Sequence, residues 1–130
     1  MTTSTPAGPT ATPPAPAGSG TKVSFADFQK LALRIGVIRE AADHPNADRL
    51  LVLQVELGGE PPERRQVVAG IKPHYAPADL VGRSVIVVTN LEPATIRGVE
   101  SQGMVLAASQ EPTLTLVVPD RPIPPGSIVK

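Results

Sequence analysis

Few side chains of this chain could hold a metal ion, and their spacing argues against such a site. His44 and Asp48 are four residues apart, which on a helix would place them on one face. Pro45 prevents a continuous helix between them, and the only other histidine is His74. A protein zinc site needs at least three such ligands. We therefore predict a turn at residues 44–48, with neither a metal nor a cofactor.

Groups suited to catalysis are equally sparse. The chain has no cysteine, so it offers neither a thiol nucleophile nor a disulfide. The carboxylate pairs Asp43/Asp48 and Glu60/Glu63 lie in turn-rich polar stretches, where solvated side chains are the usual case. Neither a phosphate-binding loop nor a Gly-x-Ser-x-Gly elbow is present. We predict that the chain alone is not an enzyme.

Charge is balanced over the whole chain but not along it. The 12 basic and 12 acidic residues give a formal net charge of zero. Residues 23–63 hold four basic and seven acidic residues, residues 64–97 hold five and two, and residues 98–120 hold none and three. A locally basic segment could hold a phosphate backbone. The alternative is that these charges simply form solvated faces, as most charged runs do.

Short β-branched and aliphatic runs separated by turn residues predict a mainly β fold around these side chains. Ser24 and Asp27 form the capping signature of a short helix, and Gly36 suits a sharply bent barrel strand. Strands at such intervals favour a small closed barrel, which leaves few exposed edges. The expected elements are helices at 25–30 and 77–82 and strands at 34–39, 50–57, 64–69, 85–88, 104–108 and 113–118.

The first part of the chain differs in composition from the rest. Residues 1–20 contain five prolines, no charged residue and none of Leu, Ile, Val or Phe, so they cannot form a packed core. We expect residues 1–22 to be a disordered tail or linker and residues 23–130 to be one domain. The chain lacks a signal-peptide pattern and any stretch of about 18 apolar residues, so we expect a cytoplasmic protein that does not enter a membrane.

A series of ordered motifs spans the predicted domain. These are Phe25-x-Asp27-Phe28-x-Lys30-Leu31-x-Leu33-Arg34-Ile35-Gly36, His44-Pro45-Asn46-Ala47-Asp48-Arg49-Leu50-Leu51, Gln66-Val67-Val68-Ala69-Gly70-Ile71, Asn90-Leu91-x-Pro93 and Ile96-Arg97-Gly98-Val99-x-Ser101-x-Gly103-Met104. The series resembles the tRNA-binding domain family, found at the C-terminus of many bacterial methionyl-tRNA synthetases, as a separate beta subunit or free-standing protein, and in eukaryotic synthetase cofactors. Where the family commonly has lysine, this chain has Arg49, which keeps the charge but replaces a point donor with a planar fork.

The resemblance implies an OB-fold, a five-stranded barrel, with a short N-terminal helix, a short helical insert and a C-terminal β extension. In the bacterial members this extension resembles a dimerisation element, so a homodimer interface is expected within residues 111–130. Its apolar surface would come from Leu114, Leu116, Val117 and Val118. An equally good alternative is that these four residues belong to an ordinary core strand.

The composition also limits how RNA could be bound. The only aromatic residues are Phe25, Phe28 and Tyr75, so we expect recognition of folded RNA through phosphates and shape rather than an aromatic stacking platform. The candidate contacts are Arg49, Arg65, Lys72 and Arg97 for phosphates, and Asn90, Ser101, Gly103 and Met104 around a turn into a strand. Asn90 could instead satisfy backbone groups of its loop, and Met104 could belong to the core.

These observations lead to three hypotheses. The resemblance implies non-catalytic, sequence-nonspecific tRNA binding by an accessory subunit or C-terminal domain of methionyl-tRNA synthetase, with the catalytic chain as a further partner. A dimeric, chaperone-like protein-interaction module on the same fold is the alternative. The chain could also be a fragment of a longer synthetase, with residues 1–22 as its linker.

Overall fold

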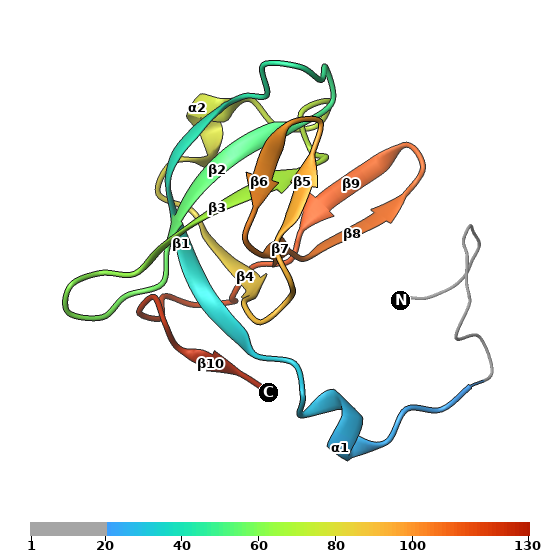
Figure 1. Ribbon diagram of the computed structural model, residues 1–130, viewed down its shortest axis with the longest axis vertical. Coiled ribbons are helices and arrows are strands. Elements are labelled where there is room, and N and C mark those ends of the chain that lie inside the picture. The colour runs from blue at the N-terminus through green and yellow to red at the C-terminus, as the bar shows by residue number, and fades with distance from the viewer. Residues whose placement is uncertain (1–20) are drawn as a thin grey trace.

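The computed structural model describes residues 21–130, and most of the predicted tail lies outside them (Figure 1). Five antiparallel strands form one curved sheet in the order β3-β2-β1-β4-β7, and β10 pairs with β1 off this path. The predicted mainly β, OB-like barrel is confirmed. The elements in chain order are α1 (Phe25–Phe28), β1 (Leu33–Asp43), β2 (Leu51–Glu56), β3 (Arg64–Ala69), α2 (Pro77–Leu80), β4 (Ser84–Val88), β5 (Ala94–Ile96), β6 (Val99–Ser101), β7 (Met104–Val105), β8 (Ala107–Gln110), β9 (Thr113–Leu116) and β10 (Ile128–Val129).

The long strand β1 bends so that it serves both halves of the barrel. Its first half pairs with β4 and its second half with β2, and the β1–β2 register shifts between Ile38 and Glu40. Gly36 lies in this strand with no room for a side chain, because a Cβ there would stand 2.5 Å from Cγ1 of Val55. The missing side chain therefore leaves room in the interior for Val55, Leu57 and Val87, as expected for a glycine in a bent barrel strand.

The barrel closes between β3 and the segment leading into β7 through side chains as well as backbone. Gln102 N–H donates to the Gln66 carbonyl at 2.7 Å, and Gln66 N–H donates to Gln102 Oε1 at 3.0 Å. Two residues further along β3, Val68 N–H donates to Ser101 Oγ at 2.9 Å. These bonds satisfy edge groups of β3 that the sheet ladder leaves open.

Alternation along the strands builds the core. Leu51, Leu53, Val55 and Leu57 point inward and are fully buried, as the period-two pattern predicts. Leu80 of α2 closes one end of the barrel and is also fully buried. The short helix α1 contributes nothing to the core, although Ser24 caps it as predicted by accepting from Asp27 N–H at 3.0 Å.

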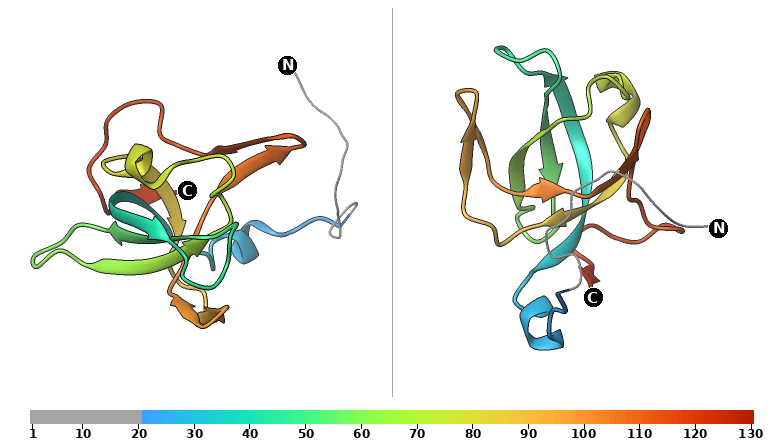
Figure 2. Two further views of the ribbon diagram at one scale, coloured as in Figure 1. Left: turned by 90° about the horizontal axis from the view of Figure 1, so that it is seen from above. Right: turned by 90° about the vertical axis from the view of Figure 1, so that its right-hand side faces the viewer.

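The structure differs from the predicted elements in the last third of the chain. The expected strand 104–108 divides at Leu106 into β7 and β8, which belong to different sheets, because Leu106 N–H bonds to Ile86 while its carbonyl accepts from Val117. The β5–β6 hairpin and β10 were not predicted. Figure 2 shows the β5–β6 hairpin and the loop between β1 and β2 rising at the same end of the barrel. Among residues 21–130, no helix is long and apolar enough to cross a membrane.

Candidate functional site

The loop between β1 and β2, residues 44–50, is folded around a buried histidine. His44 is only 5% exposed, and its Nδ1 accepts from Asn46 N–H at 2.9 Å. Since Nδ1 is the acceptor, we assign the Nε2–H tautomer, which donates to the Ile96 carbonyl at 2.9 Å. The predicted turn is confirmed, and both ring nitrogens serve to position it.

The tip of the β5–β6 hairpin meets this loop. Arg97 and Gly98 occupy the two central turn positions with φ of 53° and 90°, as a type I′ hairpin turn requires. Among the described residues, Arg97 is the one non-glycine residue with a positive φ. Asn46 holds it there, because Asn46 Nδ2 donates to the Arg97 carbonyl at 3.1 Å and Arg97 Nη2 donates to the Asn46 carbonyl at 3.3 Å. Such unfavourable backbone conformations occur preferentially at functional sites.

We call residues 44–50 and 96–98 the loop junction. They enclose a depression of about 440 Å³ lined by Asn46, Ala47, Asp48, Arg49, Leu50 and Arg97. Both arginines are exposed, and the Arg49 guanidinium makes no hydrogen bond or ion pair with the rest of residues 21–130.

A third cation, Lys72, lies beside the junction. Its backbone N–H donates to the Arg49 carbonyl, and its ammonium lies 3.4 Å from the Asp43 carboxylate. Three of the four predicted phosphate contacts thus gather at one end of the barrel.

The fourth predicted phosphate contact, Arg65, is half-buried and bonds to groups of the barrel. Its Nη1 donates to the Thr89 carbonyl at 2.7 Å and the Gln102 carbonyl at 3.2 Å, while Nε donates to Glu63 at 2.9 Å. Nη2 forms an ion pair with the same carboxylate at 2.7 Å. Most of its N–H donors are therefore used to tie β3 to the end of β4 and to the closure segment.

Three further predicted contacts also have structural partners. Asn90 accepts from Ala32 N–H and donates to the Lys30 carbonyl, so it satisfies backbone groups as in the alternative stated for it. Ser101 is 4% exposed and lies between Val68 N–H and the Gly103 carbonyl. A Cβ on Gly103 would stand 3.1 Å from the Val88 carbonyl oxygen, so this position favours close backbone packing.

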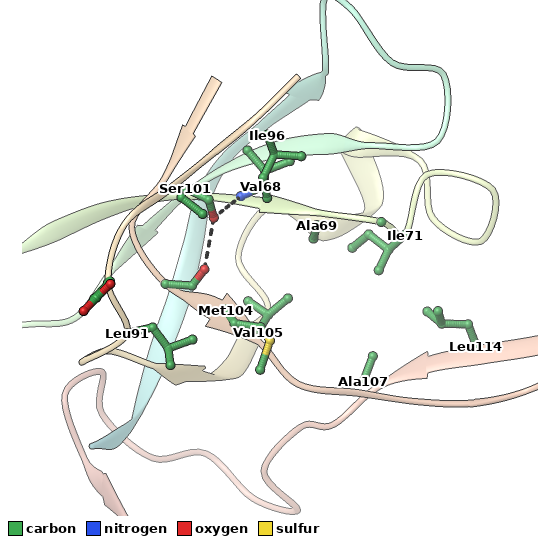
Figure 3. A pocket seen from close by; sticks show the side chains of 14 residues that line it. Val68, Ala69, Ile71, Leu91, Ile96, Ser101, Met104, Val105, Ala107 and Leu114 are labelled. Atoms are coloured by element: carbon green, nitrogen blue, oxygen red, sulfur yellow. Dashed lines mark hydrogen bonds between the residues drawn. The ribbon is translucent and has the colours of Figure 1, made fainter. Parts of the chain in front are cut away.

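Met104, the last predicted contact, is 48% exposed and borders a second hollow, which we call the apolar groove (Figure 3). The groove encloses about 410 Å³ between β3, the β5–β6 hairpin, β7 and the β8–β9 hairpin. Its lining residues are Val68, Ala69, Gly70, Ile71, Leu91, Glu92, Ala94, Ile96, Ser101, Gly103, Met104, Val105, Ala107 and Leu114.

The four residues predicted for a dimer interface differ in their exposure. Leu116 is 5% exposed and belongs to the core of this chain, and Leu114 is half-buried against that core. Val117 and Val118 are exposed beyond the end of β9. Of these four residues, only Val117 and Val118 present exposed apolar surface.

Two groups with a shifted pKa lie outside the loop junction. The hydrogen bond from Arg65 is the main cause that lowers the pKa of Glu63. The backbone N–H of Leu116 donates to the Tyr75 hydroxyl at 3.1 Å and lowers the pKa of that phenol. Both groups are hydrogen-bonded within the fold.

Sequence reasoning missed the residues that position the junction. The sequence suggests His44 only as a possible metal ligand and indicates no role for Asn46 or Ile96. The available signal was the run His44-Pro45-Asn46, in which a polar turn contains one residue that is easily buried. Its partner across the junction is 52 positions away, beyond the reach of any local pattern.

The geometry defines a class of protein. It is an OB-type barrel in which the exposed Arg49 lies on the loop after the first strand and the exposed Arg97 lies on the insertion between the fourth and fifth barrel strands. These are the loops where OB-folds commonly bind oligonucleotides. Residues 33–128 match the family model described as "Putative tRNA binding domain". This chain belongs to that tRNA-binding domain family, and the resemblance seen in its motifs is confirmed.

Sequence relatives include methionine–tRNA ligases. That of Pyrococcus furiosus is 51% identical over 108 residues, or 83% of this chain, and that of Thermotoga maritima is 48% identical over 107 residues, or 82%. The chain covers only 14% and 16% of those two proteins. It therefore corresponds to one segment of such ligases.

Solved structures show the same fold. A MetRS-related protein from Pyrococcus horikoshii aligns with a TM-score of 0.77 at 31% identity, covering 84% of this chain and 98% of that one. The chaperone CsaA of Bacillus anthracis aligns with a TM-score of 0.76 at 29% identity, covering 85% and 100%. The chain is thus similar both to proteins related to methionyl-tRNA synthetase and to CsaA.

Proposed function

We propose that this chain binds tRNA without catalysing a reaction, as an accessory domain or subunit of methionine–tRNA ligase. The observation that carries the proposal is the loop junction, which brings Arg49 and Arg97 together, with Lys72 beside it, on a barrel of the tRNA-binding domain family. The ligase relatives support the choice of enzyme, since this chain is about half identical to a segment of them.

Binding would rest on phosphates and shape. The arginines can donate to phosphate oxygens in a planar, bidentate manner, and the junction is shallow enough to meet the backbone of a folded RNA. Asp43 and Asp48 lie among the cations, so the local excess of positive charge is small. We expect moderate affinity that falls steeply as salt is added.

Filter binding of bulk tRNA at several salt concentrations tests this function. With two to three phosphates neutralised, log K should fall against log salt with a slope of about −1.4 to −2.7. Arg97→Ala and Arg49→Ala should each weaken binding of every tRNA and reduce the slope by about one. The matched control is Arg121→Ala, because Arg121 is 85% exposed and lies in the C-terminal segment outside the junction.

Three results would refute the function as stated. The absence of bulk tRNA binding at low salt, or a tRNA affinity that does not depend on salt, would rule out recognition through phosphates. Selective loss for a single tRNA species on Arg97→Ala would contradict nonspecific binding. The ligase partnership has its own test: the purified chain should lower the KM for tRNA of a methionine–tRNA ligase catalytic chain that lacks such a domain.

A homodimer remains part of the proposal. Val117 and Val118 supply exposed apolar surface in the C-terminal extension, whereas Leu116 is already used by the core of one chain. Val118→Asp should then shift the sedimentation coefficient from that of a dimer to that of a monomer, with an unchanged far-UV spectrum. A wild-type chain that sediments as a monomer at high concentration would rule the dimer out.

A chaperone-like function is the second candidate, favoured by the likeness to CsaA and by the apolar groove. An unfolded client protein bound through apolar contacts should stay bound at moderate salt, unlike tRNA. Competition between tRNA and such a client for the purified chain discriminates the two functions.

A further inference from the structure

We propose that the apolar groove takes one unpaired nucleobase of the bound RNA while the loop junction holds that nucleotide's phosphate. The inference rests on the proposed function and specifies which part of an RNA the barrel contacts. It adds a base subsite to binding that would otherwise involve only phosphates and shape.

The groove has the size and lining for a flat, uncharged ring. Its volume of about 410 Å³ lies at the lower end of the range for small-molecule clefts, which is about 300 to 1,000 Å³. Figure 3 shows the side chains of Ile96, Leu91, Met104 and Leu114 around its central space. Leu91 and Met104 are 42% and 48% exposed, so a ligand can reach them without unfolding the barrel. The polarisable thioether of Met104 suits contact with a π-system.

Charge in the groove indicates a base rather than a phosphate. Glu92 is the one charged side chain among the lining residues, and a carboxylate repels phosphate but can accept from an amino group on a base edge. The hydroxyl of Ser101 is already satisfied on both sides by Val68 and Gly103. The groove therefore offers apolar contacts and one hydrogen-bond acceptor, the Glu92 carboxylate. Both are complementary to the uncharged base of a nucleotide.

The groove and the loop junction share a wall. Ile96 lines the groove and its neighbour Arg97 lines the junction depression, with Cα atoms about 3.8 Å apart. On the other side, a Cβ on Gly70 of the groove would lie 3.7 Å from Leu50 Cδ2 of the junction. A base in the groove would thus place its own phosphate near Arg97, which is the reason to prefer RNA over an apolar peptide as the occupant.

A base can enter the groove only if it has left its stack, so paired nucleotides cannot use this subsite. The test therefore compares three probes with equal numbers of phosphates per strand: a single-stranded adenosine decamer, a decamer of abasic ribose phosphates, and a ten-base-pair RNA duplex. Fluorescence anisotropy at low salt reports the affinity of each. The native chain should bind the adenosine decamer about tenfold more tightly than the abasic one.

Variants of exposed residues separate the two subsites. The double variant Leu91→Ala/Met104→Ala should lose most of that tenfold preference and retain affinity for the abasic decamer, whereas Arg97→Ala should weaken both decamers alike. The control Leu31→Ala/Val81→Ala removes two exposed apolar side chains outside the groove and should leave all affinities unchanged. Thermal melts monitored by circular dichroism verify that each variant is folded.

The outcomes distinguish the base subsite from the proposed function. Equal affinity of the native chain for the adenosine and abasic decamers, with salt-dependent tRNA binding intact, overturns the base subsite alone. No binding of any RNA overturns the proposed function itself. Loss of binding to an unfolded client in the Leu91/Met104 variant, with both decamers unaffected, would show that the groove takes a peptide and would also overturn the inference.

Discussion

The family motif makes Ser101 a candidate RNA contact. Replacing Ser101 with alanine tests whether this residue contacts RNA or stabilises the barrel. The Ser101 hydroxyl accepts from Val68 N–H at 2.9 Å and donates to the Gly103 carbonyl at 3.0 Å, at a position only 4% exposed. Alanine removes both hydrogen bonds and adds no bulk. We therefore expect Ser101→Ala to act on the closure of the barrel.

The two groups left behind differ in access to water, which sets the size of the effect. Val68 is buried, so its N–H loses its partner outright, whereas Gly103 is half-exposed and its carbonyl can turn to solvent. An unsatisfied buried group costs about 1 to 3 kcal/mol. Counting the Val68 N–H in full and the Gly103 carbonyl in part, we expect about 2 to 3 kcal/mol of lost stability. For a domain of about 100 residues this lowers the Tm by about 10 to 20 °C.

Differential scanning calorimetry measures the loss, with Ser109→Ala as the matched control because Ser109 lies exposed on β8. Filter binding at 10 °C, where Ser101→Ala is still folded, should give a tRNA affinity within about twofold of the native chain. An unchanged Tm together with a tenfold loss of tRNA affinity would show that Ser101 contacts the RNA and does not stabilise the barrel closure.

Three further predictions concern the barrel. Gly36→Ala places a Cβ 2.5 Å from Val55 Cγ1, and the overpacking should cost about 1 to 3 kcal/mol in urea denaturation. The hydrogen bond from Arg65 lowers the folded-state pKa of Glu63, so the stability from this carboxylate is fully present above its unfolded value of 4.5 and is lost as pH falls through the lower folded pKa. Glu63→Gln should therefore flatten the acid limb of the stability–pH curve measured by denaturant titration. Asn90→Ala removes both side-chain bonds to residues 30 and 32, and amide hydrogen exchange should accelerate in α1 while the core strands keep their protection.

Much of the fold could be predicted because the information lies close together along the chain. The alternation in β2 places every second side chain of residues 51–57 in the core, and the helix cap at Ser24 involves residues three apart. The break at Leu106 could not be found in this way. That residue directs its two backbone groups to partners in β4 and after β9, and no local pattern records such a division.

The sequence could suggest which residues are candidates for the site, but not which partners their side chains contact. Positive charge and motif membership brought forward Arg49 and Arg97, which the structure places together. Positive charge alone brought forward Arg65, whose guanidinium is engaged in closing the barrel. Charge alone cannot separate these cases, because what decides between them is whether backbone carbonyls from distant segments, here Thr89 and Gln102, surround the side chain.

The backbone conformation of Arg97 bears on why an arginine occupies this turn position. A positive φ is unfavourable for a side chain of this size, yet Asn46 and the buried His44 hold the hairpin tip against the loop that carries Arg49. Asparagine or glycine at that turn position would make the hairpin more stable than arginine does. We infer that the arginine stands there for its charge and that the histidine and asparagine contacts offset the backbone strain. Under the proposed function, a phosphate would meet a guanidinium already bonded to the Asn46 carbonyl, so less side-chain freedom would be lost on binding.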